Sequence, residues 1–153
     1  MKGMVKGKKS LDEIVEVTIP SNTRHLHMMR VLTSTLAQSM GFSSTDSENA
    51  ALAVEEALTN VIEHGFHGEN THRMQVIFEL KTKLFRVRIV HNGDQVEQAD
   101  VARADDLSNY YMQKKRGGLG IVLMKKCMDE VTYKSGRRKN ECCMVKYLRK
   151  QAS

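Results

Sequence analysis

The chain has 153 residues, of which 41% are hydrophobic and 27% charged, and its net charge is +6. This length and composition predict one soluble globular domain with a core of its own. No apolar run approaches the roughly 18–20 residues of a membrane span, so no membrane partner is expected. The charge would permit nucleic-acid binding, but helix-turn-helix and zinc-finger patterns are absent and aromatic residues are few, so we expect no direct nucleic-acid partner. Three cysteines give no disulfide framework, which favours a reducing cytoplasm.

The chain begins with a basic stretch. Four of the first nine residues are lysine, so residues 1–10 are expected to form a flexible basic tail. Beyond it, no proline- or serine-rich linker and no internal repeat interrupts the sequence. Residues 11–150 are therefore predicted to form a single domain.

A strand and a helix are the first elements expected after the tail. Residues 13–19 are rich in β-branched side chains, which predicts a strand. Ser21 or Asn22 can cap the helix that follows, and its apolar positions keep a helical period to about Met40. Gly41, just beyond, is expected to stop that helix.

A longer helix is predicted over Thr45–Phe66, and it combines a wide apolar stripe with a line of polar groups. Glu56, Asn60 and Glu63 stand at i, i+4 and i+7, so their side chains share one face. Carboxylate and amide oxygens one turn apart suit Mg²⁺, which keeps several waters and is shared with substrate phosphates. A solvated helix face is the alternative interpretation of the same residues.

Two strands follow a loop rich in glycine, asparagine and histidine. Residues 73–80 and 83–90 are both rich in β-forming residues, and a turn at Lys81–Thr82 is expected to join them. In the second strand apolar and polar residues alternate, which predicts a hairpin with one buried face.

The periodic pattern is lost over residues 91–116, which have an acidic middle and a basic end and hold at most a short helix near 99–108. A loop of this length in a compact domain is typical of a functional lid or of a disordered segment, and we expect residues 98–116 to be mobile without ligand. Next, Gly117, Gly118 and Gly120 open an apolar-periodic helix. Glycines at a helix N-terminus let backbone N–H groups approach a phosphate, although such a turn is also common as a plain tight loop.

The element order closes with two strands around a turn at Gly136. Consecutive strands joined by tight turns predict an α+β fold: a two-layer sandwich with a mixed, mostly antiparallel sheet and helices on one face. Because no strand leads directly into the glycine turn, doubly wound dinucleotide-binding and P-loop folds are excluded.

Two motifs at matching spacing carry a family resemblance that covers nearly the whole chain. EEALTNVIEHGF resembles the N box of the GHKL (histidine kinase-like) ATPases, and RGGLGIVLMKKCMDEV resembles their second glycine box. The small domain with MDEV and VKYL is most similar to the bacterial anti-sigma factor serine/threonine kinases. The resemblance implies the Bergerat fold, ATP and Mg²⁺ as cofactors, a STAS-type anti-anti-sigma partner that is phosphorylated, and a sigma factor that is sequestered. Members of the family are commonly homodimers.

The resemblance also implies roles for individual residues. By position, Glu56 matches the general base toward the attacking hydroxyl, and Asn60 matches the Mg²⁺-binding asparagine. Glu63 and His64 would line the same cleft. The other nucleotide-binding positions that it implies are Arg116 for the γ-phosphate, Gly117, Gly118, Leu119 and Gly120 for the phosphates, and His91, Gly93 and Asn140 for the base.

The match fails in the first glycine box, expected as Asp-x-Gly-x-Gly but present as HNGDQ. His91 stands where the aspartate would accept the adenine amino group, and Gln95 replaces the second glycine. A neutral imidazole offers one acceptor, and losing a hydrogen bond to a charged group costs roughly 1.5–3 kcal/mol, about ten- to over a hundredfold in affinity. A second function therefore stays open: a nucleotide-impaired regulatory module that acts by protein–protein interaction only.

Overall fold

The computed structural model describes residues 12–96 and 119–150, so the basic tail and most of the proposed lid lie outside the described residues. The division into a tail and a domain over 11–150 stays a prediction. In chain order the elements are β1 (Glu13–Pro20), the 3₁₀ turn η1 (Thr23–His25), α1 (Leu26–Ser39), α2 (Ser44–Asn60), the π-helical turn η2 (Val61–Gly65), β2 (Arg73–Lys81), β3 (Leu84–His91), α5 (Leu119–Cys127), β4 (Glu130–Ser135) and β5 (Asn140–Tyr147).

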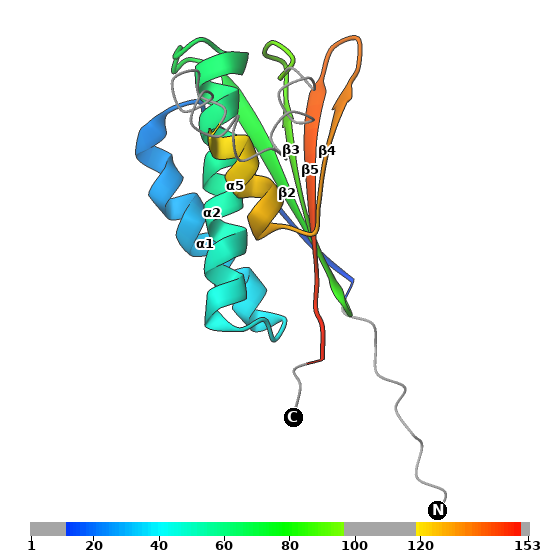
Figure 1. Cartoon of the computed structure of the whole chain (residues 1–153). Coiled ribbons are helices and arrows are strands. Elements are labelled where there is room, and N and C mark those ends of the chain that lie inside the picture. The colour runs from blue at the N-terminus through cyan, green and yellow to red at the C-terminus, as the bar shows by residue number, and fades with distance from the viewer. Residues whose placement is uncertain (1–11, 97–118, 151–153) are drawn as a thin grey trace, which may run out of the picture.

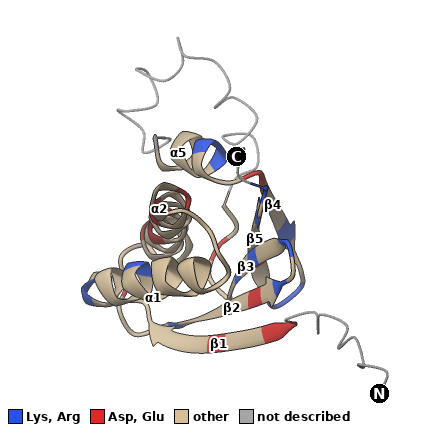
Figure 2. Ribbon diagram, turned by 90° about the horizontal axis from the view of Figure 1, so that it is seen from below, with Lys and Arg blue, Asp and Glu red and all other residues tan. Residues whose placement is uncertain are grey.

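One sheet and one layer of helices make up the described fold. The strand order is β1-β2-β3-β5-β4, and all four pairings between the described strands are antiparallel. Helices α1, α2 and α5 lie on the same side of the sheet, with α2 between the other two (Figures 1 and 2). The expected α+β sandwich is confirmed. Within the described residues no helix is long and apolar enough to cross a bilayer.

The core lies between the sheet and the helices, and β3 shows why. Its odd-numbered residues, Phe85, Val87 and Ile89, are fully buried. Arg86 and Arg88 point to the opposite face, where they pair with Glu79 and Glu141. The period-two alternation of the sequence therefore places the apolar side chains under the helices and the ion pairs on the open face.

The expected helix and strand ends need small adjustments. Asn22 caps the first helical turn by accepting a hydrogen bond from the Arg24 N–H, and Gly41 follows α1 with φ of 103°, as its role as a stop requires. The hairpin turn lies at residues 82–83 instead of Lys81–Thr82, because Lys81 pairs with Leu84. The first strand is therefore one residue longer than expected, and the second is shifted by one residue, to Leu84–His91.

The long helix differs from the regular one expected over Thr45–Phe66. It starts at Ser44, where the Ser43 hydroxyl accepts from the Asp46 N–H, and its regular part ends at Asn60. The next turn widens to a π-helix, in which the Phe66 N–H donates to the Val61 carbonyl at 2.9 Å. Single π turns are frequent at functional sites.

Candidate functional site

Glu56 lies on α2 and is half-buried under the first turn of α5. Burial raises the pKa of its carboxyl group, and the neighbouring charges of Glu55 and Glu63 raise it further. A carboxylate with a raised pKa accepts a proton more readily than an exposed glutamate does. Glu56 thus has the electrostatic environment expected of a general base.

Gly120, in the first turn of α5, brings that helix into contact with both polar residues of α2. A Cβ at this position would lie 2.6 Å from Oε2 of Glu56 and 3.6 Å from both amide atoms of Asn60. No larger residue fits unless the carboxylate moves. The structure therefore brings Gly120 of the second glycine box together with Glu56 and Asn60, and their shared role as a nucleotide site stays a prediction.

The side-chain amide of Asn60 has a defined orientation. Asn60 is buried, and its Nδ2 donates to Sδ of Met124 at 3.8 Å, an atom that also accepts from the Tyr133 hydroxyl at 3.9 Å. Its Oδ1 has no described partner, yet Ser47 Oγ is the only fully buried side-chain N or O atom left unpaired in the described chain. Oδ1 is therefore not fully enclosed by the protein.

An accessible amide oxygen fits a hard divalent cation such as Mg²⁺. Among the described residues no cluster of three or more His, Cys, Asp or Glu could hold a metal by itself. A cation on Asn60 would thus depend on water and on the phosphates of a nucleotide for its other ligands, which is the usual arrangement for Mg²⁺.

The π turn and the end of β3 approach each other through two glycines. The Asp94 N–H donates to the Gly65 carbonyl at 2.8 Å. A Cβ on Gly93 would lie only 2.5 Å from that same oxygen, so the contact needs glycine at position 93. Asn140, at the start of β5, donates from Nδ2 to the Gly93 carbonyl at 2.7 Å. Asn140 therefore holds the loop after β3.

His91 ends β3 and is buried beside this loop. Its Nδ1 accepts a hydrogen bond from the Gly93 N–H at 3.2 Å, and the ring of Phe66 packs against it edge-on, with centroids 5.8 Å apart. Burial lowers the pKa of the imidazole, so the ring is neutral at neutral pH. The single acceptor of the neutral imidazole, Nδ1, is therefore already engaged by the Gly93 N–H.

Some of the remaining expected site residues are described in the structure and others are not. Glu63 and His64 are exposed on the π turn; Glu63 is near enough to Glu56 to raise its pKa. Leu119 is described only as the first backbone residue of α5, and Arg116, Gly117 and Gly118 lie outside the described residues.

Two residues of the site were not singled out in the sequence. Gly65 packs its backbone on His91 and Gly93, and Met124 receives the amide of Asn60. Their only sequence signals are a glycine directly after the N box and a methionine on the apolar face of the glycine-box helix.

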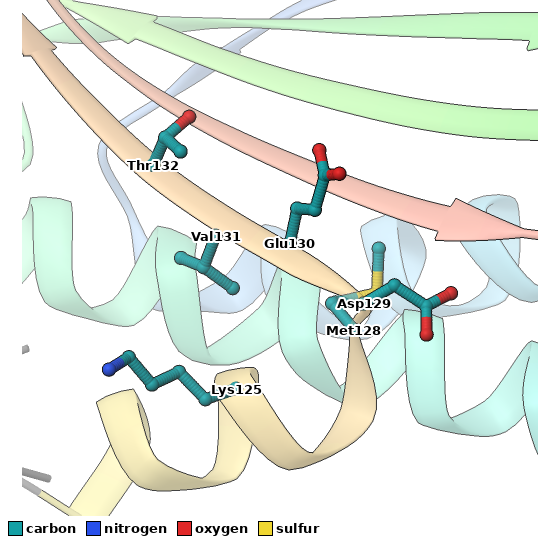
Figure 3. A pocket seen from close by; sticks show the side chains of 6 residues that line it. All are labelled: Lys125, Met128, Asp129, Glu130, Val131 and Thr132. Atoms are coloured by element: carbon teal, nitrogen blue, oxygen red, sulfur yellow. The ribbon is translucent and has the colours of Figure 1, made fainter. Parts of the chain in front are cut away.

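A separate hollow of about 460 Å³ lies between α5 and β4 (Figure 3). None of the residues above lines it. Its two acidic side chains already have partners: Asp129 accepts from the Tyr147 N–H and from Arg149, and Glu130 accepts from the Tyr147 hydroxyl. We therefore place the functional site at the other face of α5, against α2.

Comparison with known proteins identifies the family. Residues 19–146 match the model of the histidine kinase-like ATPase domain. The chain belongs to the histidine kinase-like ATPases. Within this family it is 30% identical over 141 residues to a serine-protein kinase RsbW of Bacillus velezensis, covering 89% of this chain and 86% of that protein. It is 27% identical over 149 residues to a serine-protein kinase RsbW of Staphylococcus aureus, covering 94% and 92%.

Solved structures agree with the family at the level of the fold. The RsbU and RsbW domains of Rv1364c from Mycobacterium tuberculosis superpose with a TM-score of 0.61 at 12% identity, over 88% of this chain but only 31% of that one. The histidine kinase domain of Erythrobacter litoralis EL346 superposes with a TM-score of 0.53 at 16% identity, over 85% and 62%.

Proposed function

We propose that this histidine kinase-like ATPase is a protein-serine kinase of the anti-sigma factor type, which uses ATP and Mg²⁺ to phosphorylate a STAS-type anti-anti-sigma partner. Without that partner it would hold a sigma factor. The observation that carries the proposal is the contact of Gly120 with Glu56 and Asn60. The relatives named serine-protein kinases support the substrate class. We expect the kinase to act in the cytoplasm, which its cysteine content favours, and as a homodimer, as the resemblance implies.

Glu56 would accept the proton of the partner's serine hydroxyl. As the serine oxygen bonds to the γ-phosphorus, the bond from that phosphorus to the bridging oxygen breaks and ADP leaves. The raised pKa of Glu56 favours this proton transfer. Positioning contributes more than basicity in phosphoryl transfer, so the place of the Glu56 carboxylate beside Gly120 matters as much as its charge.

Asn60 would hold Mg²⁺ through Oδ1, because its Nδ2 is engaged by Met124. When bound, Mg²⁺ neutralises charge on the triphosphate. The N-terminus of α5 lies beside both residues, and backbone N–H groups at a helix N-terminus favour phosphate.

The test is transfer of the γ-phosphoryl group to a purified STAS-type partner, with Glu56→Gln as the matched variant. We expect Glu56→Gln to bind ATP as the wild type does and to transfer about 10²- to 10⁴-fold more slowly, which is the usual contribution of a general base. Transfer at the wild-type rate would remove Glu56 from this role.

The second candidate function is a regulatory module that binds proteins without using nucleotide efficiently. The observation that favours it is His91, whose only acceptor is occupied by the Gly93 N–H. Calorimetric titration with ATP·Mg²⁺ and then with ITP·Mg²⁺ separates the two functions, because only the kinase requires nucleotide binding.

A further inference from the structure

The hydrogen bonding around His91 fixes which ring nitrogen carries the proton. A neutral imidazole has one donor and one acceptor nitrogen. Nδ1 faces the Gly93 N–H at 3.2 Å and must be the acceptor. Gly65 and Phe66 hold the ring in this orientation: a Cβ on Gly65 would lie 3.3 Å from Cε1 and 3.4 Å from Nδ1. The proton is therefore on Nε2.

Nε2 is a donor that the protein leaves available. No described residue accepts a hydrogen bond from it. Within residues 12–96 and 119–150, Ser47 Oγ is the only fully buried side-chain N or O atom without a hydrogen-bond partner. Nε2 of His91 is therefore not fully buried. The His91 residue is 5% exposed to solvent. Nε2 is therefore the donor that a ligand at this edge of the ring would meet.

An aspartate at the same place would have the opposite polarity. One carboxylate oxygen could accept from the Gly93 N–H, and the second would still be free to accept from a ligand donor. Histidine has no second acceptor. The change from aspartate to histidine thus replaces an acceptor at the end of β3 by a donor.

We propose that His91 selects a nucleoside triphosphate whose purine carries a 6-oxo group, as hypoxanthine and guanine do, over adenine. The inference rests on the proposed function, together with the family resemblance, which implies that the nucleotide base lies at His91, Gly93 and Asn140. The 6-oxo group accepts the Nε2 hydrogen bond. The 6-amino group of adenine is itself a donor, so with adenine two donors meet and both lose their partners. An unpaired buried donor lowers affinity by about ten- to a hundredfold.

The experiment is calorimetric titration of the full chain with ATP and ITP in the presence of Mg²⁺, because these nucleotides differ at position 6 of the base. Two nearly isosteric variants form the control pair. In His91→Asn the side-chain oxygen must face the Gly93 N–H, so the amide nitrogen keeps the donor polarity. In His91→Asp the second oxygen restores an acceptor. Thermal unfolding checks that both variants fold.

We expect the wild type and His91→Asn to bind ITP at least about tenfold more tightly than ATP, and His91→Asp to bind ATP more tightly than ITP. The same ATP-to-ITP ratio in all three proteins would overturn the assignment of His91 to the base, yet nucleotide binding and the proposed function would stand. If none of the three binds either nucleotide, both the inference and the proposed function fail.

Discussion

Replacing Gly120 by alanine should separate catalysis from stability. The new Cβ would lie 2.6 Å from Oε2 of Glu56, and an ordinary contact needs 3.4 Å, so this oxygen must move by about 0.8 Å. The carboxylate is the end of a flexible side chain and can move at a cost of order 0.5–1.5 kcal/mol. Alanine is favoured over glycine in a helix by up to about 1 kcal/mol. The two effects nearly cancel, so the free energy of unfolding should stay within about 1 kcal/mol of the wild type.

The rate should respond much more strongly. A misplacement of about 1 Å at a reacting group costs on the order of 10²-fold. Single-turnover transfer at saturating nucleotide measures this, and urea unfolding measures stability in parallel. In a Glu56→Gln background, Gly120→Ala should cause no further loss, because the group that it displaces is already inactive. Wild-type transfer by Gly120→Ala, or fully additive losses in the double variant, would refute the assignment of Glu56 as the base.

Four other substitutions test the same site. Asn60→Ala should weaken nucleotide binding about tenfold in the presence of Mg²⁺ and leave it unchanged in EDTA, as measured by calorimetric titration. Met124→Leu removes the sulfur that accepts from the Asn60 amide, so it should cause a smaller loss of Mg²⁺-dependent nucleotide affinity in the same titrations. Gly93→Ala should lower the free energy of unfolding by about 1–3 kcal/mol in urea, because its Cβ would meet the backbone of Gly65, which cannot rotate away. Glu56→Gln should raise that free energy at pH 7, and the difference should shrink in acid.

The fold could be predicted from the sequence because its main signals are local. Alternation in β3 fixes which face is buried, and Gly41 marks the end of α1 by a backbone conformation that glycine adopts easily. The π turn at Val61–Gly65 could not be predicted. Its widened hydrogen bonds coincide with a contact to Gly93, a residue far along the chain, and no local pattern encodes that partner.

In the site, too, features set by local sequence could be predicted, and features set by contacts between distant residues could not. The spacing of Glu56 and Asn60 on one helix was sufficient to pair them, and the glycine box was sufficient to place Gly120 at the start of the next helix. The orientation of the Asn60 amide was not predictable, because it depends on Met124 across the helix interface. The polarity of His91 was not predictable either: the sequence names an imidazole, but only the contact with the Gly93 N–H decides which nitrogen accepts.

The stability effect of Glu56→Gln bears on the choice between kinase and binding module. Burial and the charges of Glu55 and Glu63 raise the pKa of Glu56 in the folded state above its ordinary value of 4.5. Its protonated form is therefore favoured by folding. This contribution is complete below the unfolded pKa and is lost as the pH rises through the raised folded pKa. At pH 7 the ionised Glu56 opposes folding, and a neutral glutamine relieves that penalty.

A module that only binds proteins has no physical use for a half-buried carboxylate that opposes folding beside a glycine that weakens its helix. In the proposed kinase both have a use, since Glu56 would accept the proton and Gly120 would leave room for the carboxylate. Urea unfolding of the wild type and Glu56→Gln at pH 7 and near pH 4 tests this. A variant less stable than the wild type at both pH values would mean that Glu56 stabilises the fold and does not favour the kinase over the binding module.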